Sequence, residues 1–135
     1  MTWTLSLNMQ TAPDALRAVR RMIYAVVRQE GLSETNAREF ELAIGEALSN
    51  ARTHAYSNGT GPLTVDITSG TAAVAVVIHD TGAPITLPTV PTSLPSDPRA
   101  VGLFLVASLV DEVKIQRNGN GKGVSITMTK MLPLR

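Results

Sequence analysis

Apolar and polar side chains alternate in several short segments of this chain. Residues 3–9, 63–68 and 124–129 each show this period of two, which is typical of strands with one buried face. Residues 73–78 form an unbroken apolar run and predict a buried strand, and residues 113–115 begin a further one. The pattern therefore predicts five strands.

Two longer segments repeat their apolar residues with the period of a helix. The first begins at Thr11, a predicted N-cap, and ends at Gly31. The second begins at its cap Ser33 and runs to about Thr53. One face of this second helix carries Phe40, Ile44, Ala47, Leu48 and Ala51. A third, short apolar helix is predicted over residues 101–110.

Residues 81–100 contain five prolines and cannot sustain a helix or a central strand. A connection of about twenty residues is unusually long, and such loops are often active-site lids. Residues 57–62 and 118–121 are rich in glycine and asparagine and predict turns.

The predicted order is thus β-α-α-β-β-lid-α-β-β. Short turns between strands favour antiparallel pairing. We expect one domain over residues 1–135, an α/β two-layer sandwich. Its five-stranded sheet is mixed but mainly antiparallel, with three helices on one face.

Composition narrows the function classes. The formal net charge of +1 gives no whole-protein argument for binding nucleic acid or an anionic membrane. The chain has no cysteine, which excludes disulfides and thiolate metal sites. It also lacks a run of 18 apolar residues and the layout of a signal peptide, so we expect a cytoplasmic location.

Glu46 and Asn50 are the first candidates for chemistry. They lie four residues apart in the second predicted helix and therefore project from the same face. A carboxylate can accept a proton, and a neutral amide oxygen suits Mg²⁺. Asp80 and Gly82 end the buried strand and add a second polar segment. Together the two segments predict a nucleotide pocket.

Three stretches of the chain resemble motifs of the GHKL ATPases. They are EALSNA with HAY at residues 46–56, GLFLV leading to VDEV at residues 102–113, and GKG at residues 121–123. Within that superfamily, the chain is most similar to the anti-sigma factor serine/threonine protein kinases of bacterial partner-switching systems. The likeness runs from about Ser33 to Lys130.

The resemblance implies the Bergerat ATP-binding fold, with ATP held between sheet, helices and lid. It implies that Glu46 is the general base and that Asn50 is the Mg²⁺ ligand. Asp80 would accept a hydrogen bond from the adenine amino group. Gly82 would let the backbone approach the nucleotide.

The resemblance assigns three further residues to ATP binding. Backbone N–H groups near Gly102, at the start of a helix, would meet phosphate oxygens. Arg99 could reach the γ-phosphate, although a lid side chain without contacts is an equal alternative. Ser125 takes the place of a family threonine near the adenine, or it reflects strand alternation alone.

Two departures from the family motifs leave the activity open. Pro84 and Ala100 stand where glycines are usual, both on the phosphate side. The resemblance implies phosphorylation of an anti-anti-sigma protein, sequestration of a sigma factor, and a homodimer. The alternatives are a partner-sequestering module of the same fold without transfer, and a nucleotide-sensing subunit of another complex. The basic face at Arg17, Arg20 and Arg21 is either a docking surface or a solvated helix face.

Overall fold

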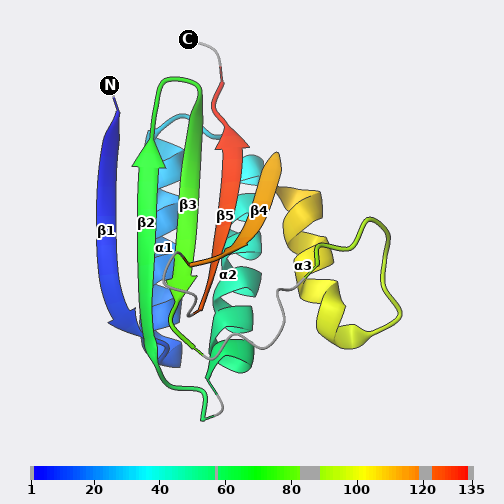
Figure 1. Ribbon diagram of the computed structural model, residues 1–135. Helices are drawn as coiled ribbons and strands as arrows, with labels where there is room; N and C mark the ends of the chain where they lie inside the picture. The colour runs from blue at the N-terminus through cyan, green and yellow to red at the C-terminus, as the bar shows by residue number, and fades with distance from the viewer. Residues whose placement is uncertain (1, 57, 83–88, 119–122, 134–135) are drawn as a thin grey trace.

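A five-stranded sheet forms one layer of the protein (Figure 1). The computed structural model describes residues 2–56, 58–82, 89–118 and 123–133. The strands are β1 (Trp3–Gln10), β2 (Pro62–Ser69), β3 (Ala73–Asp80), β4 (Glu112–Arg117) and β5 (Val124–Met131). Their order across the sheet is β1-β2-β3-β5-β4.

All four neighbouring pairs in this sheet are antiparallel. The expectation of a mixed sheet was wrong in this detail. β4 does run parallel to β3, but β5 lies between them and pairs with both. The two helices that join β1 to β2 bring the chain back beside β1 in the opposite direction.

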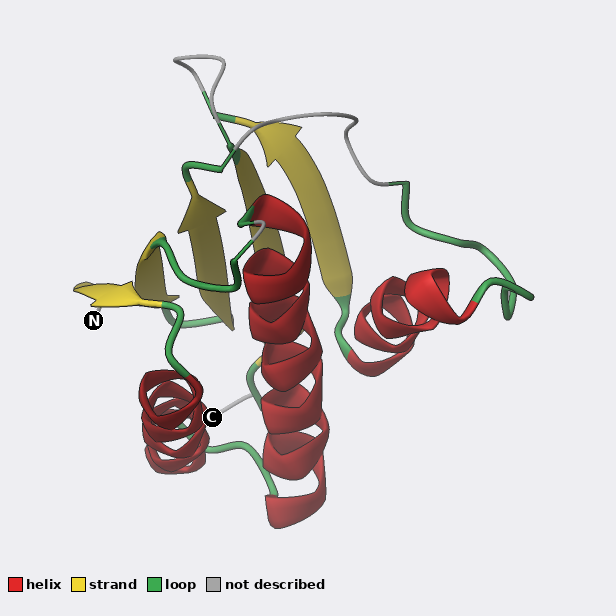
Figure 2. Cartoon of the chain, turned by 90° about the horizontal axis from the view of Figure 1, so that it is seen from below, coloured by secondary structure: helices red, strands yellow, loops and turns green. Residues whose placement is uncertain are grey.

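Three helices cover one face of the sheet, as expected (Figure 2). They are α1 (Pro13–Gln29), α2 (Glu34–Ala55) and α3 (Pro98–Leu109). α2 lies in the middle, with α1 on the β1 side and α3 on the β4 side. The strands alternate accordingly. In β2, Leu63, Val65 and Ile67 are buried against the helices, while Asp66 projects from the other face.

The helix ends follow local chemistry at two of the predicted positions. The Ser33 hydroxyl accepts a hydrogen bond from the Asn36 N–H at 3.1 Å and caps α2. Gly31 follows α1 with a φ of 112°, a conformation that favours glycine. Both predictions are confirmed.

Thr11 is not the cap of α1. Ala12 holds that position and makes no side-chain cap bond, and Pro13 begins the helix. Thr11 is instead fully buried. Its hydroxyl donates to the Gly59 carbonyl at 2.8 Å and accepts from the Gly61 N–H at 3.1 Å. The side chain therefore joins the turn before β2 to the start of α1.

The core lies between the sheet and the helices. Its large, fully buried side chains come from α1, α2 and the inner face of the sheet, and include Ile23, Phe40, Ile44, Leu48, Ile67, Ile78 and Met128. α2 is buried on one face from Ala37 to Ala51. This packing fixes the position of the polar residues that lie between its buried ones. Among the described residues, no helix is long and apolar enough to cross a membrane.

The proline-rich segment is only partly described. Residues 83–88, with Pro84 and Pro88, lie outside the described residues, as do residues 119–122 of the predicted turn. Residues 89–97 form neither helix nor strand. α3 begins at Pro98, so the last three residues of the predicted lid are helical. Proline suits a first helical position because its missing N–H would have no partner there.

Candidate functional site

Glu46 and Asn50 lie one turn apart on α2, and both side chains are half-buried. Neither makes a hydrogen bond or ion pair with any residue in the described part of the chain. An acid and an amide placed together without protein partners are available to a ligand. The helical spacing predicted from the sequence is present in α2.

Gly102 brings α3 onto this pair. A Cβ built on Gly102 would lie 2.9 Å from Glu46 Oε2 and 3.6 Å from Asn50 Oδ1. Glycine allows this close approach, because a methyl group here would displace the Glu46 carboxylate. The structure therefore brings the motif at Glu46 and Asn50 together with the motif at Gly102, which lies 52 residues after Asn50 in the sequence.

Gly102 is not at the start of its helix. It is the fifth residue of α3, and only the first four N–H groups of a helix lack a partner within it. The Gly102 N–H is thus within the helix and is not presented to a phosphate. Ala100 also lies in α3, where its N–H donates to the Asp97 carbonyl at 3.0 Å. A helical backbone suits alanine, so this departure from glycine causes no strain here.

Asp80 ends β3 and is half-buried. Its Oδ1 accepts hydrogen bonds from the Gly82 and Val124 N–H groups, both at 3.2 Å. Burial raises the pKa of the Asp80 carboxyl above its usual range, and these two N–H groups partly offset the rise. Among the described residues, none donates to Oδ2. One oxygen is therefore held in place while the other is available to a donor.

The raised pKa predicts the stability of an Asp80→Asn variant. The folded protein binds the Asp80 proton more tightly than the unfolded chain does, so the ionised carboxyl costs stability at pH 7. We expect Asp80→Asn to be at least as stable as the wild type at pH 7. The difference should shrink as the pH falls through the folded pKa toward 3.8. Urea unfolding at several pH values measures this. An Asp80→Asn protein less stable at pH 7 would show that the two N–H bonds to the charged form outweigh its desolvation.

The loop after Asp80 packs on the end of α2. Gly82 is buried, and a Cβ there would lie 2.1 Å from the Ala55 carbonyl oxygen, which no side chain can tolerate. The Tyr56 hydroxyl accepts from the Thr81 N–H at 3.0 Å and also bonds the Pro62 carbonyl. Sequence reasoning gave Tyr56 no role, and the only signal was its place at the end of the helix motif.

The site therefore extends along one helix. α2 carries the acid and amide at Glu46 and Asn50, and it ends against Gly82 at Ala55. Ala55 lies nine positions after Glu46 on the helix, which corresponds to about 13.5 Å along the axis. The arrangement sets the half-buried carboxyl of Asp80 at one end and, at the other, an acid and an amide that have no partner among the described residues.

Ser125 does not join this site. It pairs with His79 across β3 and β5, one position away from the inner-facing Ile78–Ile126 pair, so its side chain lies on the outer face. Its hydroxyl contacts His79 Nδ1 at 2.7 Å and donates to Asn118 Oδ1. Strand alternation places the Ser125 side chain on the opposite face of the sheet from Asp80, and its contact with adenine stays a prediction. On β5 it is the Val124 backbone that reaches Asp80.

The outer-face contacts of Ser125 form a network of residue types that hydrolases use. His79 Nε2 lies 3.1 Å from Asp66 Oδ2, on the far side of the ring from Ser125. A hydroxyl has a single proton, and Ser125 gives it to Asn118 rather than to the imidazole. This serine is therefore a structural hydrogen-bonding group and not an activated nucleophile.

Asn118 links that network to the site. Its Nδ2 donates to the Asp80 carbonyl at 2.7 Å, and its Oδ1 accepts from Ser125. The amide thus holds the backbone of Asp80 from the other face of the sheet. The sequence showed Asn118 only as a turn residue, so pattern reasoning missed it.

Arg99 lies in the first turn of α3, and its side chain is outside the described residues. The structure thus leaves its proposed contact with phosphate a prediction. Glu46, Asn50 and Gly102 are brought together, and Asp80 and Gly82 lie farther along the same helix.

Comparisons with known proteins identify relatives of this chain. The family model described as histidine kinase-like ATPase domain matches residues 9–130. The chain is 26% identical to the serine-protein kinase RsbW of Oceanobacillus iheyensis, over 95% of this chain and 86% of that protein. It is 27% identical to the protein of the same name from Bacillus licheniformis, over 89% of this chain and 80% of the other.

A solved structure shares the fold. The crystal structure of the RsbU and RsbW domains of Rv1364c from Mycobacterium tuberculosis matches with a TM-score of 0.67 at 20% identity. The match covers 98% of this chain and 33% of that longer one. With the family model matched over nearly the whole chain and the same fold in a solved structure, the protein belongs to the histidine kinase-like ATPase domain family.

Proposed function

We propose that this protein is an anti-sigma factor and an ATP-dependent serine/threonine protein kinase that phosphorylates an anti-anti-sigma protein. The observation that carries the proposal is the contact of Gly102 with Glu46 and Asn50, which assembles an acid, an amide and a helix backbone. The relatives named serine-protein kinase, each matched over 80% or more of its own length, support the same reaction.

The Asp80 end of the site suits an adenine. Oδ1 is held by two backbone N–H groups, which leaves Oδ2 to accept a hydrogen bond from the exocyclic amino group. Gly82, which has no side chain, lets the loop after Asp80 pack against the Ala55 carbonyl at the end of α2. These features fit the adenine base of ATP. When bound, ATP would supply the γ-phosphoryl group for transfer.

The other end suits Mg²⁺ and the incoming hydroxyl. The Asn50 side-chain oxygen would be one Mg²⁺ ligand, since this ion commonly takes few protein oxygens and completes its shell with phosphates and water. The Glu46 carboxylate would accept the proton of the serine or threonine hydroxyl. The new bond joins that oxygen to the γ-phosphorus, and the bond from phosphorus to ADP breaks.

A second function has a specific observation in its favour. The Gly102 N–H lies within α3 rather than at its start, and Ala100 replaces a usual glycine. A phosphate would then meet fewer backbone donors. We therefore keep a partner-sequestering module, without transfer, as the alternative. The kinase proposal includes a contact of Arg99 with the γ-phosphate, and the sequestering module needs no such contact.

The partners follow from the proposed reaction. They are an anti-anti-sigma protein as phosphoacceptor and a sigma factor, with a second copy of this chain in a homodimer. A cytoplasmic location and the lack of direct nucleic-acid contact belong to the same proposal. The near-neutral formal charge of +1 is consistent with protein partners.

Calorimetric titration with ATP, with and without Mg²⁺, tests the proposal together with transfer of label from γ-labelled ATP. The phosphate acceptor for this assay is an anti-anti-sigma protein with a serine or threonine, sought among the genes beside that of this chain. We expect Mg²⁺-dependent binding and label on that partner. A folded protein that binds the partner but neither form of ATP would instead be the sequestering module. Absence of any sigma-factor or anti-anti-sigma gene nearby would favour the nucleotide-sensing subunit.

A further inference from the structure

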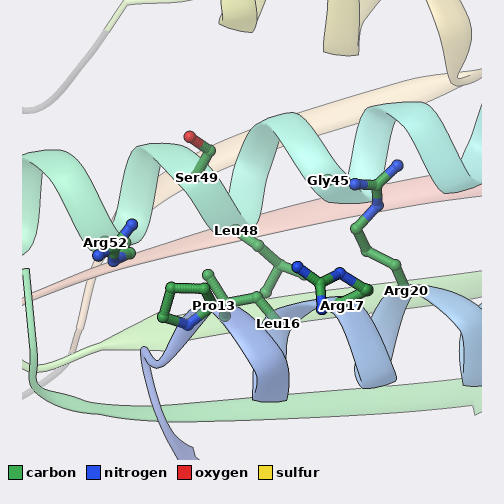
Figure 3. A pocket seen from close by; sticks show the side chains of 8 residues that line it. All are labelled: Pro13, Leu16, Arg17, Arg20, Gly45, Leu48, Ser49 and Arg52. Atoms are coloured by element: carbon green, nitrogen blue, oxygen red, sulfur yellow. The ribbon is translucent and has the colours of Figure 1, made fainter.

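A basic hollow lies between α1 and α2 (Figure 3). It measures about 200 Å³, and its lining includes Arg17, Arg20 and Arg52. Gly45 and Ser49 of α2 also line it. They directly precede Glu46 and Asn50, and adjacent helix residues point about 100° apart. The hollow is therefore separate from the site that Gly102 contacts.

Arg20 is the unusual residue of this hollow. Its side chain extends from α1 to α2 and lies over Gly45, where a Cβ would be only 2.8 Å from Arg20 Nε. Arg20 Nε is buried, and it has no hydrogen-bond partner among the described residues. A buried charged donor without an acceptor is costly and calls for an explanation. The α2 backbone at Gly45 covers Nε, so an anion in the hollow would contact the rest of the Arg20 guanidinium, which lines it.

The nearby carboxylates do not supply that acceptor. Asp14 pairs with Arg17 at 3.1 Å, and Glu41 pairs with Arg38 at 3.7 Å. Glu41 lines a neighbouring hollow together with Arg17, Arg20 and Arg21. Four arginines, at positions 17, 20, 21 and 52, thus surround a region with two carboxylates, each already engaged. These two adjoining hollows, called the groove below, therefore carry an excess of positive charge.

We propose that this groove binds a phosphate-class oxyanion, with Arg20 as its main ligand. A guanidinium presents a planar fork of N–H donors that matches phosphate oxygens. Arg17, Arg52 and the Ser49 hydroxyl offer further donors from both helices. The hollow is smaller than the roughly 300–1,000 Å³ of sites for drug-sized ligands. It exceeds several times the roughly 30 Å³ that one water occupies, which suits a small anion. This site is independent of the proposed kinase reaction.

Titration with inorganic phosphate at constant ionic strength, followed by two-dimensional NMR, tests the site residue by residue. We expect saturable shifts of the Gly45 and Ser49 amides and of the Arg20 Nε–H signal. Arg20→Met should abolish them. Arg20→Lys keeps the charge but loses the fork, and it should weaken binding by about tenfold or more. Arg117→Met, an equal charge change on the exposed strand β4, should leave the shifts intact.

The free energy of unfolding provides an independent readout, because Arg20→Met should have different effects on it without and with phosphate. Without phosphate, Arg20→Met should be as stable as the wild type or more stable, because it removes an unsatisfied buried donor. With phosphate, the wild type should gain stability and the variant should not. Shifts confined to Gly82 and Gly102, equal shifts in Arg20→Met, or equal shifts with acetate would each overturn the proposal.

Discussion

The Glu46→Ala variant is expected to transfer phosphate about 10²- to 10⁴-fold more slowly than the wild type, which is the usual contribution of a general base. Its affinity for ATP should change little, because the proposed adenine contact at Asp80 and the proposed Mg²⁺ contact at Asn50 are left unchanged. The variant should also fold normally, since Glu46 is only half-buried and has no partner among the described residues. Single-turnover transfer of labelled phosphate, measured beside ATP titration, separates the rate from the affinity.

Glu39→Ala is the matched control for this prediction. Glu39 lies on α2 seven residues before Glu46 and pairs with Lys130 at 3.8 Å, away from Gly102. It should transfer phosphate at close to the wild-type rate. If Glu46→Ala keeps the wild-type rate while Glu39→Ala loses it, the wrong carboxylate has been assigned as base.

The Phe40→Ala variant is expected to lose about 3–5 kcal/mol of unfolding free energy. Phe40 is fully buried in α2 and is the largest of the fully buried side chains. Its removal leaves a cavity between the helix and the sheet. For a domain of this size, such a loss lowers the melting temperature by roughly 10–18 °C. It also consumes a large part of the 5–15 kcal/mol that stabilises a typical domain.

Leu42→Ala provides the control within the same helix. Leu42 lies two residues away but is 44% exposed, so its truncation should change stability by no more than about 0.5 kcal/mol. Urea unfolding of both variants measures the two free energies. Similar losses in the two would mean that α2 does not bury the face that carries Phe40.

The outline of the fold could be read from the sequence because it depends on local periodicity. The apolar stripe of α2 and the alternation of β2 each require one buried face, so both elements were predictable. The spacing of Glu46 and Asn50 followed from the same helix geometry. The cap at Ser33 and the glycine at Gly31 are local backbone effects, and both predictions held.

Other assignments depended on contacts between distant segments. Thr11 has a side chain suited to a helix cap, yet the turn at Gly59 and Gly61 engages its hydroxyl instead. Asn118 and Tyr56 hold Asp80 and Thr81 across 38 and 25 residues of chain. No local pattern contains such contacts, so pattern reasoning gave these residues no part in the site.

The sequence alone determined which residues form helices and strands and which turn of α2 carries an acid beside an amide, because those properties arise within a few neighbouring residues. Tertiary structure decided that Gly102 meets that pair from inside α3, that Ser125 faces away from Asp80, and that the Arg20 Nε is buried over Gly45. Strand pairing and helix packing set these outcomes, since each depends on how distant segments dock against one another.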